Sequence, residues 1–283
     1  MGNKLKLLVS VGAAIGLMLL AINVVGLFLP LRSPEINESY SDFARRGTPS
    51  LNDSLNMLKL LSANHVPKSE FLKEATRIFH YGIAHIPKED IEKNGFDYYR
   101  MRVPLWENYI LYLLSYLKPD TYRDYEFCSY QKALERGTGR CGQQSLALVD
   151  YLHRNDIETG FIRLGGHAIA TAKAEDGTWY MLDPDYGGVI PFGLEQAEAE
   201  PASVIPYYWG PAITTNNMYL LFGKEQNAIR YGGPEARFGR ACKIERASYA
   251  LKWAIPALLI LLWLAYQVRQ HIYAKHQTNI HPR

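Results

Sequence analysis

Residues 137–155 read GTGRCGQQSLALVDYLHRN, and this stretch predicts both a core helix and the residue that begins it. Three glycines surround Cys141, and apolar side chains then recur at helical spacing until a break at Asn155. Such spacing is typical of a buried helix, which we expect to begin at Cys141. The unpaired N–H groups and the positive dipole end of a helix N-terminus favour a thiolate over a thiol. The stretch therefore predicts a nucleophilic cysteine.

Two predicted strands carry a histidine and an aspartate at their ends. His167 begins the run HAIATAK at 167–173, and Asp183 ends the run TWYMLD at 178–183, where Pro184 stops the strand. A short turn joins the two runs, so we expect an antiparallel hairpin in which the two side chains are neighbours. A thiolate needs a base beside it, and the base needs a third group that fixes its tautomer. Cys141, His167 and Asp183 are the candidate catalytic residues.

These three motifs, in this order, resemble the transglutaminase-like superfamily of papain-type thiol enzymes. The resemblance covers about residues 68–190 and rests on G-x-C before an apolar helix, His-Ala on a strand, and Trp-x-x-x-Asp-Pro at the end of the next strand. It implies that Cys141 is the nucleophile, His167 the general base and acid, and Asp183 the orienting carboxylate, as in a membrane-anchored bacterial member. Ile169 departs from the aromatic residue that many members carry shortly after the histidine, which bears on substrate preference.

Each candidate residue also has a structural explanation when taken alone. A single cysteine is commonly a small buried hydrophobic residue. A strand histidine before Ala-Ile-Ala is commonly a core residue, and an aspartate before proline is commonly a turn residue. The chemical interpretation therefore depends on the three motifs occurring together.

Composition and spacing exclude some other functions. The net charge of +3 over 283 residues is small, and no basic stripe interleaved with aromatic residues occurs, so we expect no nucleic-acid partner. The sequence has no CxxC or HExxH motif. His80 and His85 are five residues apart on a predicted helix and would not share a face. We therefore expect no metal and no cofactor.

Two long apolar runs lie near the ends of the chain. Residues 7–29 and 249–268 are each long enough to cross a bilayer, and Lys252 is the main polar interruption of the second. A cleaved signal peptide is the alternative for the first run, because Lys4 and Lys6 precede it. The run is longer than a usual signal sequence and no small-x-small cleavage site follows, which favours an uncleaved anchor.

The apolar runs define the expected domain organisation. We predict an N-terminal transmembrane anchor at 1–29, a membrane-proximal stalk at 30–66, a catalytic domain with a C-terminal extension at 67–248, a transmembrane helix at 249–268 and a short basic tail at 269–283. The predicted location is the cell membrane, with both termini inside and the catalytic domain extracytoplasmic or periplasmic.

The pattern of elements between the two runs predicts an α+β fold. Helices are expected at 54–62, 68–85, 106–117 and 127–135, followed after the cysteine helix by strands at 159–164, 167–173, 178–183 and 188–191. The resemblance makes this a papain- or transglutaminase-like core, in which helices pack on an antiparallel sheet. Residues 191–217 contain four prolines and are expected to be irregular, either packing on the domain or forming a lip of the site.

Cys128 and Cys242 leave two alternatives open. An oxidising compartment would join them in a disulfide and leave Cys141 as a single free thiol. Otherwise both are reduced and buried.

The predicted mechanism is attack of the Cys141 thiolate on an amide carbonyl, with His167 protonating the departing amine. Water or a second amine then resolves the thioester, so the enzyme is a peptidase or amidase, or a transglutaminase-like acyltransferase, acting on a peptide or protein. The Cys141 N–H is one expected oxyanion donor, and Tyr130 or Gln131 would supply a second.

Two other kinds of function remain as hypotheses. One is a non-catalytic domain that binds peptide or glycan as an accessory in envelope or polysaccharide assembly. The other is a structural envelope protein that recruits partners through its spans, where Gly12, Ala13 and Gly16 allow close helix contact.

Overall fold

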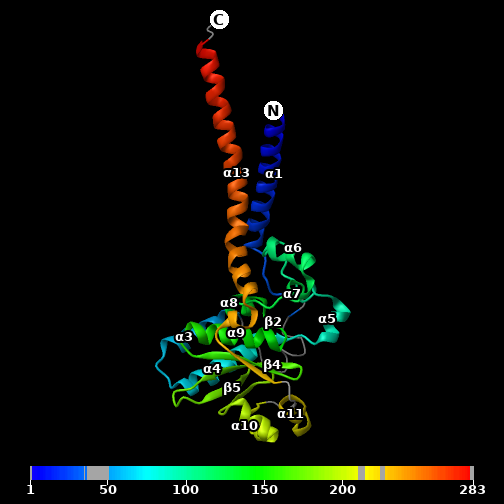
Figure 1. Cartoon of the computed structure of the whole chain (residues 1–283), viewed down its shortest axis with the longest axis vertical. Helices are drawn as coiled ribbons and strands as arrows, with labels where there is room; N and C mark the ends of the chain where they lie inside the picture. Colours follow the sequence, from blue (N-terminus) through cyan, green and yellow to red (C-terminus); the bar gives the residue numbers. More distant parts are fainter. Residues whose placement is uncertain (1, 35, 37–50, 210–213, 224–226, 281–283) are drawn as a thin grey trace.

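The computed structural model describes residues 2–34, 36, 51–209, 214–223 and 227–280, and the chain is α+β with an antiparallel sheet. Two long helices rise side by side from a domain that holds the sheet and the shorter helices (Figure 1). The α+β class that the sequence predicts is therefore confirmed.

Five antiparallel strands form the main sheet in the order β6-β5-β4-β3-β7. They are β3 (Thr159–Leu164), β4 (His167–Lys173), β5 (Trp179–Asp183), β6 (Gly188–Ile190) and β7 (Ala228–Tyr231). Four of them lie where the sequence predicts strands. The fifth, β7, comes from a short segment without an alternating pattern and was missed; it pairs with β3.

Helices cover both faces of this sheet. One face packs against α4 (Lys68–Gly82) and α9 (Cys141–Arg154), with α3 (Leu51–Ala63) packed on α4. The other face packs against α10 (Leu194–Ala199), a 3-10 helix at Pro201–Tyr207 and α11 (Thr215–Phe222). Residues 191–217 are thus largely helical where they are described, not irregular as expected, and they supply the second core; 210–213 lie outside the described residues. Buried Leu194, Val204 and Met218 provide the apolar contacts.

Small side chains on β4 set the position of α9. Ala168, Ala170 and Ala172 lie on the strand face toward the helix, so the helix backbone approaches the sheet closely. Ser145 Oγ donates a hydrogen bond to the Ala168 carbonyl at 2.9 Å. This contact places the first turn of α9 next to His167, the first residue of β4.

The remaining elements adjust two of the predicted boundaries. They are β1 (Ala84–His85), β2 (Thr138–Gly139), α5 (Lys88–Asn94), α6 (Tyr109–Leu117), α7 (Pro119–Tyr122), α8 (Tyr130–Arg136) and α12 (Pro234–Phe238). The helix expected at 68–85 ends at Gly82, because Ala84 and His85 pair in parallel with β2. The helix expected at 106–117 begins at Tyr109, because the Asn108 side chain caps it by accepting from two backbone N–H groups.

The two long helices are α1 (Gly2–Gly26) and α13 (Arg240–Ile280), and each contains a segment long and apolar enough to cross a membrane, Lys4–Gly26 and Arg240–Tyr273. A Cβ at Gly16 would lie 3.0 Å from both Leu259 Cβ and the Pro256 carbonyl oxygen, so glycine allows the close contact between them. The N-terminal end of α1 and the C-terminal end of α13 both point away from the domain (Figure 1). Helix α13 is far longer than the run predicted at 249–268 and continues down into the domain.

Polar contacts join the helix pair to the domain at Lys252. Its Nζ donates to the Glu107 carbonyl at 2.5 Å, and its own carbonyl accepts from Asn23 Nδ2 of α1 at 2.6 Å. The polar interruption of the second apolar run is therefore a junction between α1, α13 and the segment before α6.

The described part of the expected stalk packs onto the domain. Leu31, Leu58 and Leu61 are buried in the same core as Phe71 and Leu72 of α4. Residues 37–50 of that expected segment lie outside the described residues.

Candidate active site

Cys141 is the first residue of α9 and is half-buried. Arg140 precedes it in extended conformation, and no side chain caps the helix, so the N–H groups of the first turn face the space around the sulfur. All three cysteines lie in the described part of the chain, and Cys141 is the one without a disulfide. The structure therefore confirms the predicted helix start and leaves a free thiol at its positive end.

The segment before α8 closes tightly over the turn that carries Cys141. A Cβ at Gly142 would collide with the Glu126 carboxylate and the Arg237 guanidinium, so any larger residue here would displace one of these side chains. Glu126 is partly buried, and burial raises the pKa of its carboxyl, although the charge of Arg237, 3.5 Å away, opposes this. An acid from the segment before α8 and a cation from α12 thus lie against the backbone that follows the sulfur.

His167 is buried at the start of β4 and contacts both Asp183 and Cys141. Its Nε2 lies 2.9 Å from Asp183 Oδ2, and the Cys141 thiol is also a hydrogen-bond partner of the imidazole. The ring of Tyr186 covers the imidazole, with centroids 4.8 Å apart. The side chains that the sequence predicts as neighbours are therefore brought together from α9, β4 and β5.

Asp183 is fully buried and accepts hydrogen bonds at both oxygens. Oδ1 accepts from the backbone N–H groups of Asp185 and Tyr186 at 3.0 and 3.1 Å. Oδ2 accepts from His167 and from the Tyr208 hydroxyl at 3.1 Å. With these partners the carboxylate has one orientation, which in turn fixes the orientation of the imidazole.

The charge of the imidazole follows from these neighbours. Burial disfavours the protonated ring, but the Asp183 charge, its hydrogen bond, the contact with Cys141 and the Asp185 charge outweigh burial and raise the pKa of His167 well above its ordinary value. An imidazolium next to the sulfur at neutral pH favours the thiolate. The arrangement thus has the partners of a thiolate–imidazolium pair oriented by a carboxylate.

Three further residues reach the site that sequence reasoning did not assign to it. Asp185 is buried, and its Oδ2 lies 3.9 Å from His167 Nδ1. His85 Nδ1 lies 2.9 Å from Asp185 Oδ1, and His80 Nδ1 lies 2.9 Å from the Pro184 carbonyl oxygen. The prediction that both histidines lie on one helix is wrong, because α4 ends at Gly82 and His85 belongs to β1. In the sequence, the pair of carboxylates in Asp183-Pro184-Asp185 is the feature that could have indicated a role for Asp185 in the site.

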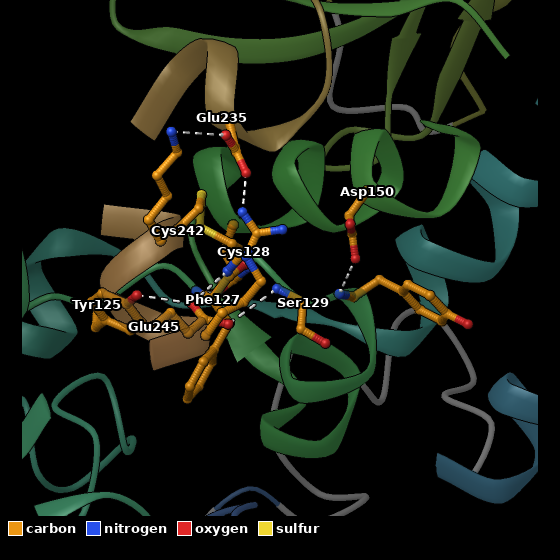
Figure 2. The surroundings of a disulfide bond; sticks show 12 residues. Tyr125, Phe127, Cys128, Ser129, Asp150, Glu235, Cys242 and Glu245 are labelled. Atoms are coloured by element: carbon orange, nitrogen blue, oxygen red, sulfur yellow. Dashed lines mark hydrogen bonds and ion pairs between the residues drawn. A yellow bond between two sulfur atoms is a disulfide. The ribbon is translucent and has the colours of Figure 1, made fainter. Parts of the chain in front are cut away.

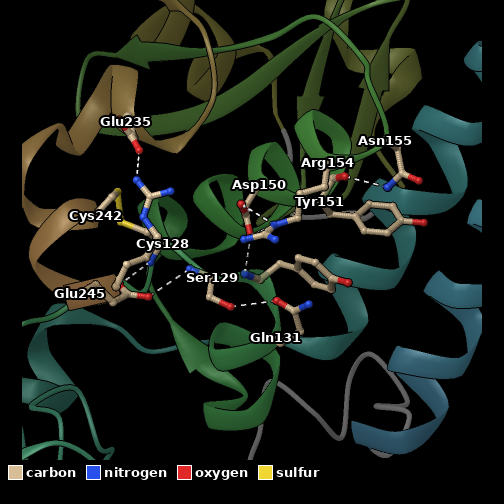
Figure 3. Close-up of polar contacts among 12 residues, drawn as sticks. Cys128, Ser129, Gln131, Asp150, Tyr151, Arg154, Asn155, Glu235, Cys242 and Glu245 are labelled. Atoms are coloured by element: carbon tan, nitrogen blue, oxygen red, sulfur yellow. Dashed lines mark hydrogen bonds and ion pairs between the residues drawn. A yellow bond between two sulfur atoms is a disulfide. The ribbon is translucent and has the colours of Figure 1, made fainter. Parts of the chain in front are cut away.

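Tyr130 and Gln131, the side chains considered for a second oxyanion donor, lie elsewhere. The Tyr130 backbone N–H donates to Asp150 Oδ2 at 3.0 Å, and its ring packs on Tyr151. Asp150 is nine residues along α9 from Cys141, about 13 Å at the helical rise. Gln131 bonds to Ser129 at this same end of α9, as Figure 3 shows. Neither side chain reaches the sulfur.

Of the two alternatives for the other cysteines, the structure has the bridged one. Cys128 and Cys242 form a disulfide that links the segment before α8 to the base of α13. The Glu245 carboxylate beside it accepts from the backbone N–H groups of Cys128 and Ser129 and from the Tyr125 hydroxyl (Figure 2). The long helix is thus fastened to the same segment that carries Glu126 over the candidate site.

A cavity of about 390 Å³ lies between α4 and the β6 edge of the sheet. Its walls include Tyr180, Tyr207 and Trp209, with Lys73 and Glu70 from α4. The Trp209 ring packs edge-on against His80, and the Trp209 backbone N–H donates to the Gly187 carbonyl, so this cavity neighbours the turn that holds Asp183 and Asp185. It offers an aromatic wall beside the candidate site.

No protein-family model matches this chain, and no curated protein matches it either.

Proposed function

We propose that the chain is a membrane-anchored thiol enzyme that acts on amide bonds through a thioester at Cys141. One observation carries the proposal: the buried His167 imidazole contacts the free thiol and, through Nε2, the buried Asp183 carboxylate. These are the groups that nucleophilic thiol catalysis needs, and they come from three separate elements. The papain- or transglutaminase-like core is part of the same proposal.

The chemistry proceeds in two steps. The thiolate attacks the amide carbonyl, and His167 gives its proton to the departing amine as the carbon–nitrogen bond breaks. Water or an amine then attacks the thioester and His167 takes up the proton, which regenerates the thiolate. The Cys141 N–H at the open end of α9 faces the developing oxyanion. The substrate is a peptide or protein amide.

The proposed location is a cell membrane with the domain on its extracytoplasmic side. Two observations support it: the paired apolar helices, and the disulfide, because disulfides persist in oxidising compartments.

The first test is alkylation of Cys141 by iodoacetamide at neutral pH in the purified full chain. We expect the second-order rate to fall by about tenfold or more in His167→Ala and to a smaller extent in Asp183→Asn, because each removes part of the group that stabilises the thiolate. His65→Ala, at an exposed histidine remote from the site, is the matched control. Equal rates in all four proteins contradict the proposal.

The second test traps the acyl-enzyme. Incubation with a peptide mixture, followed by mass spectrometry of the intact chain, should give an adduct that hydroxylamine removes and that Cys141→Ser lacks. Addition of a primary amine distinguishes hydrolysis from acyl transfer, since only transfer gives an amine-containing product.

A non-catalytic domain that binds peptide or glycan is the second candidate. The aromatic cavity beside the site favours it, because Trp209, Tyr207 and Tyr180 offer ring faces on which sugars or proline-rich peptides stack. Trp209→Ala would then abolish binding, and Cys141→Ser would leave binding unchanged.

A further inference from the structure

We propose that Cys141, His167 and Asp185 form a binding site for a divalent metal ion of the zinc type. The thiol enzyme needs Asp183 but assigns no task to Asp185, although Asp185 is just as completely enclosed, with 3% of its surface exposed. One ligand atom from each of the three residues lies within 4.8 Å of the other two. Metal binding at this site is independent of the proposed catalysis. That a bound metal would inhibit the enzyme, by occupying Cys141, rests on the proposed function.

The two side chains that flank the imidazole divide its nitrogens between them. Nε2 is taken by Asp183, while Nδ1 lies 3.9 Å from Asp185 Oδ2. Ligands at about 2.0–2.3 Å from a tetrahedral zinc ion lie roughly 3.3–3.8 Å from one another. The Nδ1–Oδ2 separation is close to this value, and a ligand atom of Cys141 lies within 4.8 Å of its partners, so the metal would draw the sulfur closer.

The two proposed ligands other than Cys141 already have outer partners. Metal-binding histidines commonly donate their second N–H to a carboxylate, as His167 does to Asp183. Metal-binding carboxylates are commonly held by a hydrogen bond at their other oxygen, as Asp185 is by His85 at 2.9 Å. The outer contacts that fix ligand geometry are therefore present before any ion binds.

The charges around the site favour a cation. The Asp183 and Asp185 carboxylates and a Cys141 thiolate face a single imidazole between them. A metal ion bound to the thiolate sulfur and to Nδ1 of the neutral imidazole takes the place of the one proton that the imidazolium carries there, and that proton leaves to solvent. One sulfur, one nitrogen and one carboxylate oxygen suit zinc, whereas calcium and magnesium prefer oxygen ligands alone.

Cobalt(II) is the probe for the test, because it replaces zinc and its absorption reports the ligands. The purified full chain, freed of metal by a chelator, is titrated with cobalt(II) and then with zinc. We expect one ion per chain, a sulfur-to-cobalt charge-transfer band and the strong visible bands of tetrahedral cobalt, all removed by zinc. The charge-transfer band should vanish in Cys141→Ser.

Asp185→Asn is the decisive variant, since it keeps the size of the side chain. We expect its dissociation constant for cobalt to rise by about tenfold or more, while Asp120→Asn, at an exposed acid on α7, binds as the wild type does. Circular dichroism checks that Asp185→Asn is folded. Absence of the charge-transfer band in the wild type, or wild-type affinity in folded Asp185→Asn, overturns the site.

Alkylation in the same samples separates the two proposals. Zinc should slow iodoacetamide labelling of wild-type Cys141 by tenfold or more and slow that of Asp185→Asn much less at equal concentration. Fast alkylation in metal-free buffer without a cobalt signal contradicts the metal site but not the thiol enzyme. A cobalt signal together with slow alkylation that is independent of His167 supports the metal site and contradicts the thiol enzyme.

Discussion

The two ends of α9 hold cysteines and buried carboxylates in quite different settings. At the N-terminus, Cys141 and Asp183 share one histidine. Toward the C-terminus, Cys128 is bonded to Cys242, and Glu245 accepts from N–H and O–H donors that carry no charge. Figure 3 shows Asp150 and Arg154 of α9 beside this second group. Residue type is the same at both ends, and the partners differ: the free Cys141 faces a histidine, whereas Cys128 is bonded to a second cysteine.

The two ends also differ in the charged groups that surround their buried carboxylates. Asp183 faces an ionisable base, so a proton can move between groups there. Burial raises the pKa of Glu245, and its contacts with Cys128, Tyr125 and Ser129 only oppose that shift. The first end is suited to chemistry and the second to anchoring α13.

The largest expected effect is on labelling stoichiometry under non-reducing, denaturing conditions. Wild type should take up one iodoacetamide and Cys141→Ser none, because the other two sulfurs are bonded to each other. Intact-mass spectrometry measures both numbers. After reduction Cys141→Ser should take up two. If this variant takes up two labels before reduction, Cys128 and Cys242 are not bonded to each other, and the contrast between the two ends of α9 is wrong.

Loss of the disulfide should affect stability but not reactivity. Cys128→Ala combined with Cys242→Ala opens a link between residues 114 apart, and we expect unfolding to become easier by about 2–5 kcal/mol. Denaturant unfolding of the full chain measures this. Cys141 should alkylate at the wild-type rate in folded protein. A large fall in that rate would mean that the disulfide end also controls the thiol.

Loss of the His167 imidazole should affect the reactivity of Cys141 but not the stability of the fold. The pKa of His167 lies well above its ordinary value, so the ring keeps its proton, and the thiolate keeps its partner, through neutral pH. In His167→Ala only a few per cent of the thiol is ionised at pH 7, and alkylation should be about 30-fold slower.

The pH profile checks the sign of this effect. In metal-free buffer the wild-type rate should persist to lower pH, while the rate of the variant follows a thiol pKa of about 8.5, and the two should converge above it. Superimposable profiles, or a large loss of stability in the variant, would contradict the assignment.

The smallest expected effect concerns Glu245. Its folded pKa is raised by burial, so its stabilising contribution is present below the unfolded pKa and is lost as pH rises through the folded pKa. Glu245→Gln stays neutral and should remove that part of the pH dependence, with a change at pH 7 of about 1 kcal/mol from altered hydrogen bonds. Unfolding free energies at pH 5 and pH 7 measure the slope. Glu235→Gln, at an exposed acid nearby, is the control.

The sequence predicts local elements well where one pattern dominates. The strands 159–164 and 167–173 match β3 and β4, and the helix start at Cys141 is correct. The helix predicted through His85 extends too far, because the parallel pair of β1 with β2 depends on a segment more than fifty residues away. Pairing of β7 is likewise a long-range event without a local signal.

The sequence by itself determined the order of Cys141, His167 and Asp183, the two apolar segments and the α+β class, because each depends on local pattern. Tertiary structure alone decided that Asp185 and His85 reach the imidazole and that Cys128 meets Cys242. It also decided that residues before Lys68 enter the core. The reason is physical: contacts between distant segments depend on packing of the whole domain, and no spacing in the chain encodes the distance between two side chains that different elements carry.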